Sequence, residues 1–282
     1  MFKILRQSIR TGVVTRPFPD ASSVPPPGFR GKPVIDFARC TACEQCANAC
    51  PTTAITLRNA GQSETEKILS LSYGACIFCG ACEEACPDSI SLTPEYQLAT
   101  EKKDALTTEA LYRKRDDGSL QFVRMMTDGI PGETRSLDDI GAEVKLKIDQ
   151  TFGRSLQIRE VDAGSCNGCE IEITALNNAI YDIERFGIHF VASPRHADML
   201  LVTGPVTRNM EIALRETYEA TPEPRLVVAV GACAISGGIF GRSYASCGGV
   251  DTVVPVDVYI PGCPPRPEAL LHGILMALGR KK

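Results

Sequence analysis

Thirteen cysteines stand out among the 282 residues, and eight of them fall into two runs. The runs extend from Cys40 to Pro51 and from Cys76 to Pro87, and each reads C-x2-C-x2-C-x3-C-P. This spacing lets one loop hold three corners of a [4Fe–4S] cubane, while the fourth Cys of each run binds the other cluster. The expected ligands are Cys40, Cys43, Cys46 and Cys86 for cluster 1, and Cys76, Cys79, Cys82 and Cys50 for cluster 2.

Zinc is the alternative for such runs, because it also binds four thiolates from C-x2-C pairs. Zinc sites usually join two pairs, whereas this chain has two runs of four that both end in Pro. The repeat also places Ile55 and Ile90 at matching positions behind the two runs. We therefore expect a pseudo-symmetric ferredoxin-like fold of the α+β class that holds two clusters.

A third group of cysteines follows predicted strands of the second half. Cys166 and Cys169 form a C-x2-C pair after the first strand, and Cys233 and Cys263 follow two later strands. Ligands bind at the carboxyl edge of an open parallel sheet, so we expect these four to hold a third [4Fe–4S] cluster. A lone buried Cys can also act as a small apolar residue. We expect this of Cys247, which lies outside the pattern.

The second half alternates apolar runs with helical patterns, which predicts an α/β flavodoxin-like domain with a parallel sheet. Strands are expected at 156–161, 188–191, 199–202, 226–230 and 256–260, and helices at 170–185, 208–218 and 266–278. The expected domains are an N-terminal amphipathic helix with a Pro-rich connector (1–33), a two-cluster ferredoxin domain (34–100), a linker with a hairpin near Asp117-Gly118 (101–150), and the α/β domain (151–282).

The N-terminal segment places Phe2, Leu5, Ile9 and Val13 on one helical face, with basic residues around the other side. Such a helix suits a membrane surface or a groove of a partner. Packing on its own domain is the alternative. The formal net charge of -4 gives no sign of a nucleic-acid partner. Disulfides are not expected, because no export signal is present and the cytosol keeps thiols reduced.

Three segments carry a family resemblance: Cys166 to Glu172, Ser193 to Asp198, and Gly231-Ala-Cys233 with Val256 to Pro265. They resemble the small subunit of membrane-associated group 4 [NiFe] hydrogenases and the related 20-kDa-type subunit of complex I. The front half, from Gly28 to Leu92, resembles the two-cluster ferredoxin subunit of formate hydrogenlyase. The chain thus looks like a fusion of two neighbouring subunits.

The resemblance implies an electron-transfer subunit that passes electrons through three clusters to or from a NiFe site on a separate large subunit. It also implies other subunits of a membrane-bound complex and a peripheral location on the cytoplasmic face of the inner membrane. The sequence itself shows no apolar run long enough to span a bilayer. The complex I subunit has two adjacent cysteines where this chain has C-x2-C, so the hydrogenase type is favoured. A complex I-like quinone oxidoreductase without nickel remains the alternative.

The resemblance also singles out three charged residues. Arg195 corresponds to an arginine close to the proximal cluster, where its charge would favour the reduced state; a surface ion pair, for example with Asp198, is the alternative. Glu170 and Glu172 are candidates to relay protons toward the large subunit. The alternative for both is a helix N-terminal charge favoured by the helix dipole.

Overall fold

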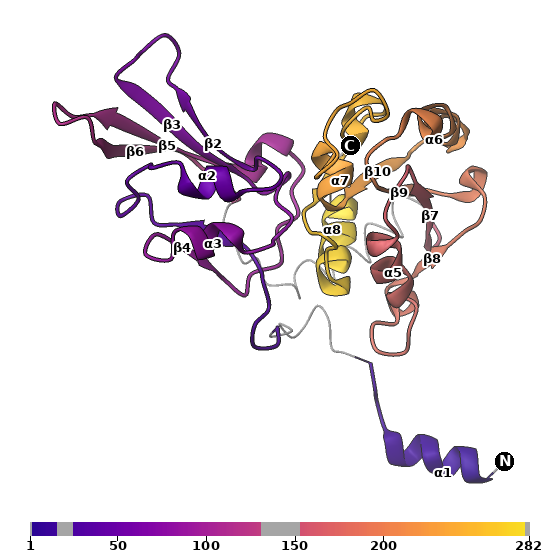
Figure 1. The fold of residues 1–282 in the computed structure, drawn as a ribbon. Helices are drawn as coiled ribbons and strands as arrows, with labels where there is room; N and C mark the ends of the chain where they lie inside the picture. The colour runs from indigo at the N-terminus through magenta and orange to yellow at the C-terminus, as the bar shows by residue number, and fades with distance from the viewer. Residues whose placement is uncertain (1, 16–24, 131–152, 280–282) are drawn as a thin grey trace.

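The computed structural model describes residues 2–15, 25–130 and 153–279. It contains an N-terminal helix, a front domain and an α/β domain, arranged as in Figure 1. Residues 16–24 of the predicted connector and 131–150 of the predicted linker lie outside the described ranges. In the part that the structure describes, no helix is both long and apolar enough to cross a bilayer.

The front domain wraps its two cysteine runs around short elements. Each run contains a single-turn helix, α2 (Gln45–Ala49) or α3 (Ala81–Ala85). The strand β1 (Pro33–Ile35) pairs antiparallel with β4 (Ile90–Leu92), which brings the start and the end of the predicted ferredoxin segment together. The strand β2 (Ile55–Asn59) pairs antiparallel with β3 (Glu66–Ser72).

The structure corrects the linker predicted for 101–150 over its described first part. A 3-10 turn, η1 (Lys103–Leu106), leads into β5 (Thr107–Lys114) and β6 (Leu120–Asp128). These strands extend the front sheet in the order β2-β3-β5-β6. The predicted hairpin is present: Gly118 adopts φ 85°, and the Asp117 carboxylate accepts a hydrogen bond from the Ser119 amide at 2.8 Å. The high density of charges had suggested a linker, but one face of the hairpin is buried, including Ala110 and Tyr112.

The α/β domain contains five strands in the order β11-β10-β9-β7-β8, and all neighbouring pairs are parallel. They are β7 (Leu156–Asp162), β8 (Ile188–Phe190), β9 (Met199–Thr203), β10 (Leu226–Val230) and β11 (Val258–Ile260). Read along the chain, this is the doubly wound order 2-1-3-4-5 of flavodoxin-like folds. The predicted parallel-sheet architecture is confirmed.

The strands β9 and β10 are buried on both sides, because helices cover both faces of this sheet. Met199 and Leu201 pack with α5 (Gly168–Ala175) and α8 (Pro267–Gly279). Leu200 and Val202 pack on the opposite face with α6 (Arg208–Ala220) and α7 (Gly231–Ser236). The sequence did not predict α7, which is a short helix that begins directly at the end of β10.

The helix predicted over 170–185 is shorter than expected. It ends at Ala175, and a separate 3-10 turn, η2, covers Ile183–Phe186. The side chain of Asn178 accepts hydrogen bonds from the amides of Ile180 and Tyr181, at 2.8 and 3.1 Å. Asn side chains compete with helical hydrogen bonding in this way, which explains the early end.

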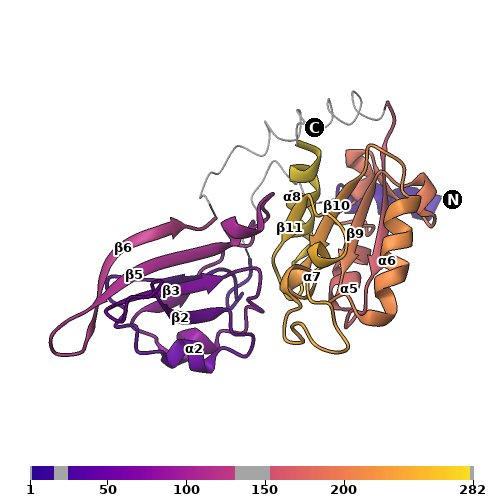
Figure 2. The ribbon, with the colours of Figure 1, turned by 90° about the horizontal axis from the view of Figure 1, so that it is seen from above.

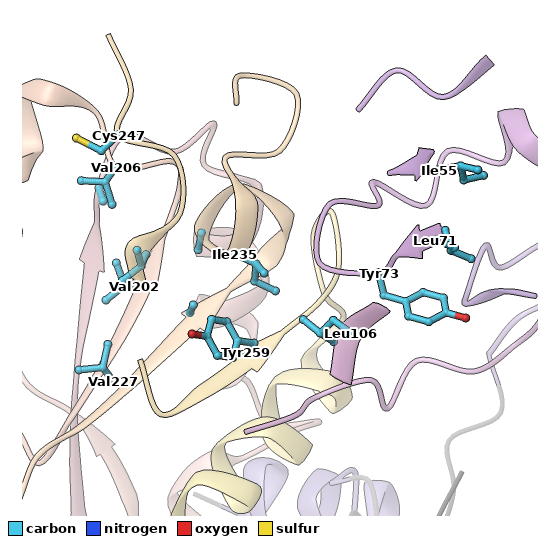
Figure 3. Packing of buried hydrophobic residues seen from close by; sticks show 14 of the residues in the cluster. Ile55, Leu71, Tyr73, Leu106, Val202, Val206, Val227, Ile235, Cys247 and Tyr259 are labelled. Atoms are coloured by element: carbon cyan, nitrogen blue, oxygen red, sulfur yellow. The ribbon is translucent and has the colours of Figure 1, made fainter. Parts of the chain in front are cut away.

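The two domains share one hydrophobic core. Figure 3 shows Leu106 of the front domain beside Ile235 and Tyr259, whereas the Tyr73 ring points back into the front domain. The contact is close, since a Cβ built on Gly74 would lie 2.7 Å from the Ile235 side chain. At the periphery, Lys103 forms an ion pair with Asp251 at 2.7 Å. Figure 2 also shows the front domain beside the β11 edge of the parallel sheet. The domains are therefore packed together.

The N-terminal helix α1 (Phe2–Thr11) has no buried residue. Figure 1 shows it standing away from both domains. Its large apolar side chains are exposed, with Phe2 at 86% and Ile9 at 74%. Within the described residues, α1 therefore does not pack on its own domain, which was one of the two alternatives for this segment.

Candidate functional site

The first cysteine group consists of Cys40, Cys43, Cys46 and Cys86. Burial raises the pKa of the Cys46 thiol to about 12, and the nearby charges of Cys86 and Cys40 act in the same direction. Burial raises the pKa of Cys86, and the charge of Cys43 acts in the same direction, so Cys86 lies close to the cysteines of the first run. Cys86 belongs to the second run of the sequence, so the fold brings it across to the first.

The second cysteine group consists of Cys50, Cys76, Cys79 and Cys82. All four line one cavity, together with apolar side chains such as Ile55 and Leu92. Burial raises the pKa of Cys76 to about 12, and the thiolates of the other three members raise it further. Backbone amides point at these sulfurs: Ala54 N lies 3.3 Å from Cys50 Sγ, and Phe78 N lies 3.3 Å from Cys76 Sγ.

The third cysteine group consists of Cys166, Cys169, Cys233 and Cys263. They follow the carboxyl ends of β7, β10 and β11, at the edge where parallel strands present ligands. Burial raises the pKa of Cys233 to about 11, and the charges of Cys263 and Cys166 add to this effect. The pKa of Cys169 is raised by burial, by Glu170 and by the other three cysteines of the group.

Glycines keep the space beside the third group open. Gly231 adopts φ +86°, and a Cβ at this residue would lie 2.7 Å from Cys169 Sγ. Gly238 adopts φ +55°, and a Cβ there would lie 2.7 Å from Cys233 Sγ. Both positions need a residue without a side chain, on conformational and on steric grounds. The cleared space beside four converging thiols suits a bulky inorganic group.

The donor set also matches iron–sulfur chemistry. Each group offers four sulfur ligands, which [4Fe–4S] clusters prefer, and an amide–sulfur contact is of the kind that tunes cluster potentials. In the described ranges, no three His, Cys, Asp or Glu side chains are gathered as they would be around a single metal ion. In a cubane, by contrast, each thiolate binds a different iron atom.

The carboxylate of Glu170 lies beside the third group, since its charge acts on Cys169 and Cys233, and Glu160 lies near Glu170. Both side-chain oxygens of Glu170 and Oε1 of Glu160 are buried without a hydrogen-bond partner. Burial raises the pKa of Glu160, and the charge of Glu170 raises it further, which places the two carboxylates near each other. Burial also raises the pKa of Glu172. The charge of Glu268 acts in the same direction, and the charge of Arg266 acts in the opposite direction. The sequence had singled out Glu170 and Glu172 but not Glu160, which lies inside a strand.

Arg195 does not join the third group, which corrects the placement inferred from the sequence. It is an exposed residue of the turn η3 (Pro194–His196), immediately before β9 begins. The cysteines follow the carboxyl ends of the parallel strands, so Arg195 lies at the opposite edge of the sheet. Asp198, the ion-pair partner considered for Arg195, instead binds Arg154 through two hydrogen bonds of 2.9 Å.

Cys247 stands apart from the three groups. It is buried, and its thiol donates a hydrogen bond to Glu211 at 3.2 Å. The same carboxylate binds Arg208 at 3.1 Å, so the Cys247 loop is tied to α6. This environment agrees with the expectation of a free buried thiol.

Sequence reasoning missed two arginines at the junction of the domains. Arg30 donates a hydrogen bond to the carbonyl of Cys79 at 2.8 Å. Arg266 follows the Cys263-Pro-Pro turn and, together with Arg30 and Cys263, lines a cleft between the domains. Only the Cys263-Pro-Pro-Arg266 spacing could have signalled Arg266, and nothing in the sequence indicates which residues it contacts.

Two family profiles match the chain. One is described as a 4Fe-4S dicluster domain and covers residues 39–90. The other is described as NADH ubiquinone oxidoreductase, 20 Kd subunit, and covers residues 166–277. The fold and the cysteine groups thus define an iron–sulfur protein of the oxidoreductase-subunit class, with a ferredoxin-type domain followed by an α/β domain.

Known relatives refine this class. A probable membrane-bound hydrogenase subunit of Pyrococcus furiosus is 53% identical over 45% of this chain and 76% of its own length. Formate hydrogenlyase subunit 7 of Escherichia coli is 49% identical over 54% of this chain, which spans 59% of that relative. An NADH-quinone oxidoreductase subunit of Desulfovibrio desulfuricans is 53% identical over 44% of this chain and 67% of its own length. The chain belongs to the family of these 20-kDa-type subunits.

Proposed function

We propose that this chain is the electron-transfer subunit of a membrane-associated group 4 [NiFe] hydrogenase complex. Three [4Fe–4S] clusters would be held by the first, second and third cysteine groups, each with its four named cysteines. The observation that carries this proposal is the gathering of twelve cysteines from distant segments into three sets of four. The names of the hydrogenase relatives support the same function.

The order of the clusters follows from the cysteines that link the groups. Cys50 and Cys86 each connect one run to the other, so the first and second groups are neighbours. The pKa of Cys263 is raised by burial and by the charges of Cys166 and Cys79, so the second group lies next to the third. Electrons would therefore pass through the groups in the order first, second, third, or in reverse.

The third group would face a large subunit that carries the nickel–iron site. Its cysteines reach the surface, since Cys166 and Cys263 are exposed. Exposed apolar side chains lie on the segments around them, including Ile171 at 61% and Phe240 at 54%. An open cluster edge with apolar surroundings suits a tight protein–protein contact that excludes water.

A complex I-like quinone oxidoreductase without nickel is the second candidate. The relatives named as NADH-quinone oxidoreductase subunits favour it. The C-x2-C spacing of Cys166 and Cys169 favours the hydrogenase instead. The large subunit that co-purifies with the chain decides between them. A large subunit with two C-x2-C pairs and bound nickel supports the hydrogenase, and one without either supports the quinone enzyme.

Glu170 and Glu172 would relay protons at the large-subunit interface. Both follow Cys169 on α5, and the buried oxygens of Glu170 and the raised pKa of Glu172 support a role in proton transfer. In the assembled complex, Glu170→Gln or Glu172→Gln should slow hydrogen turnover while the EPR spectra of all clusters remain unchanged. Altered cluster spectra would indicate a structural role instead.

The helix α1 would hold the complex against the cytoplasmic face of the inner membrane. It carries Lys3, Arg6 and Arg10 and no acidic residue, next to exposed Phe2, Leu5 and Ile9. Each cation near an anionic lipid surface contributes about 1 kcal/mol, and the apolar side chains add burial in the interface. The arrangement therefore fits a surface of anionic phospholipid.

Vesicles of phosphatidylglycerol and phosphatidylcholine test this location by co-sedimentation. The double variant Leu5→Gln/Ile9→Gln should reduce binding strongly, and high salt should weaken wild-type binding. Ile212→Gln is the matched control, because Ile212 is equally exposed, at 72%, on a helix of the α/β domain. Equal binding of all three proteins would count against a membrane role for α1.

The central test of the function is the metal content of the purified chain. Three cubanes require about 12 iron atoms and about 12 acid-labile sulfides per chain. Zinc in place of iron, with no broad visible absorbance, would overturn the proposal.

A further inference from the structure

The guanidinium of Arg266 is fixed inside the α/β domain by one carboxylate. Arg266 lies immediately before α8 and directly after Cys263-Pro-Pro. Its Nε and Nη2 donate hydrogen bonds of 2.8 and 2.9 Å to the two oxygens of Glu268. The Glu268 side chain is fully buried and that of Arg266 is 16% exposed. A two-point contact with a planar fork fixes orientation as well as position.

The same guanidinium lies against two aromatic rings of the front domain. Its central carbon is 4.7 Å from the centre of the Tyr96 ring and 5.3 Å from that of Phe29. The two rings are perpendicular, with centres 6.4 Å apart. Both distances fall within the range of cation–π contacts, which gain strength when water is excluded. Arg266 thus joins the two domains at the cleft that Cys263 lines.

On the front-domain side, the contact continues to the second cysteine group. Arg30, the neighbour of Phe29, donates a hydrogen bond of 2.8 Å to the carbonyl of Cys79. Phe78 and Gly31 line the same cleft. Cys79 and Cys263 are therefore linked by one short series of contacts: the turn from Cys263 to Arg266, the rings of Phe29 and Tyr96, and the Arg30 bond.

We infer that Arg266 is a positioning residue that sets the distance between the clusters of the second and third cysteine groups. The inference rests on the proposed electron-transfer function. One electron would leave one cluster, which is oxidised, and enter the other, which is reduced, and no covalent bond forms or breaks. Because electron transfer slows steeply with distance, a contact that fixes both cysteine loops controls this step.

Two variants of Tyr96 test the inference without touching the buried ion pair of Arg266 with Glu268. Tyr96→Leu removes the ring, and Tyr96→Phe keeps it. Arg266→Lys keeps the charge but loses the two-point contact with Glu268. Lys103→Met is the control, since it removes an ion pair of the same domain junction at a site away from the cysteines.

The measurement is the magnetic interaction between reduced clusters in EPR spectra of the full chain, with iron content as a check. In the wild type, the signals of the second and third groups should be split by mutual interaction. Tyr96→Leu and Arg266→Lys should lose that splitting at unchanged iron content, whereas Tyr96→Phe and Lys103→Met should keep it.

The inference is overturned if Tyr96→Leu and Arg266→Lys keep the full splitting, or if Lys103→Met loses it equally. A wild type with about 12 iron atoms but no splitting would also overturn it. These results differ from a failure of the proposed function, in which the wild type itself lacks iron and EPR signals. A variant that loses iron would point to a role of its residue in cluster assembly, against a positioning role.

Discussion

Cys79 and Cys263 come from different domains, yet the charge of Cys79 contributes to the raised pKa of Cys263 after burial and Cys166. This proximity marks the place where the ferredoxin-type domain and the α/β domain bring two cysteine groups together. The shared hydrophobic core around Leu106 and Ile235 holds the junction in place. Replacing single cysteines can test each of the three groups separately.

Replacement of Cys166 by alanine should remove the third cluster and leave the two clusters of the front domain. Cys166 follows β7 of the α/β domain, so the folding of the front domain should not depend on it. EPR spectra of the reduced protein should then retain two signals, with iron content reduced by about 4 atoms. Cys247→Ala is the control and should keep all three clusters. Loss of every signal in Cys166→Ala would contradict this assignment.

Replacement of Cys50 by alanine should affect the second cluster more than the first. Cys50 is the last residue of the first run, but its charge acts on Cys76 and Cys82 of the second group. The counterpart variant Cys86→Ala should affect the first cluster instead. Separate EPR signals or selective conversion to a three-iron form would report which cluster each variant damages. If Cys50→Ala damaged the first cluster, the exchange of fourth ligands would be wrong.

Gly231→Ala should prevent assembly of the third cluster. The added Cβ would lie 2.7 Å from Cys169 Sγ, and an alanine at φ +86° adds a strain of about 1–2 kcal/mol. Gly241→Ala is matched for backbone strain, since Gly241 has φ +55° and nothing within 4 Å of its added Cβ. Iron content should fall in the first variant and stay near that of the wild type in the second. Equal iron content in both would show that the steric argument fails.

His272 should make the α/β domain sensitive to mild acid. Burial lowers the pKa of this α8 residue from 6.5 to about 4, and its Nδ1 is buried without a hydrogen-bond partner. Between these two values the unfolded chain binds a proton that the folded chain excludes, so stability is lost as the pH falls from 6.5 toward 4. The shift corresponds to about 3 kcal/mol.

The melting temperature at pH 7.5 and pH 5 measures this effect. His272→Leu should show a smaller loss of melting temperature than the wild type over the same interval. His196→Leu is the control, because His196 is exposed and should leave the pH dependence unchanged. A wild-type acid sensitivity that His272→Leu does not reduce would assign the effect to other groups.

The sequence by itself determined the cysteine runs and the parallel-sheet domain. It also predicted that Cys50 and Cys86 each bind the cluster of the other run. These features depend on short spacing and on periodic apolar residues, which local chain geometry translates directly into loops and strands. The position of Cys166, Cys233 and Cys263 at one sheet edge also followed, because parallel strands all end on the same side.

Only the tertiary structure decided which residues meet across the sheet and between the domains. The place of Arg195 before β9 already followed from the predicted strand, but its exposure and the pairing of Asp198 with Arg154 are seen only in the structure. The contact of Arg266 with Phe29 and Tyr96 joins segments far apart in the chain. Such contacts are set by how two hydrophobic faces pack together, and no local pattern of residue types encodes that packing.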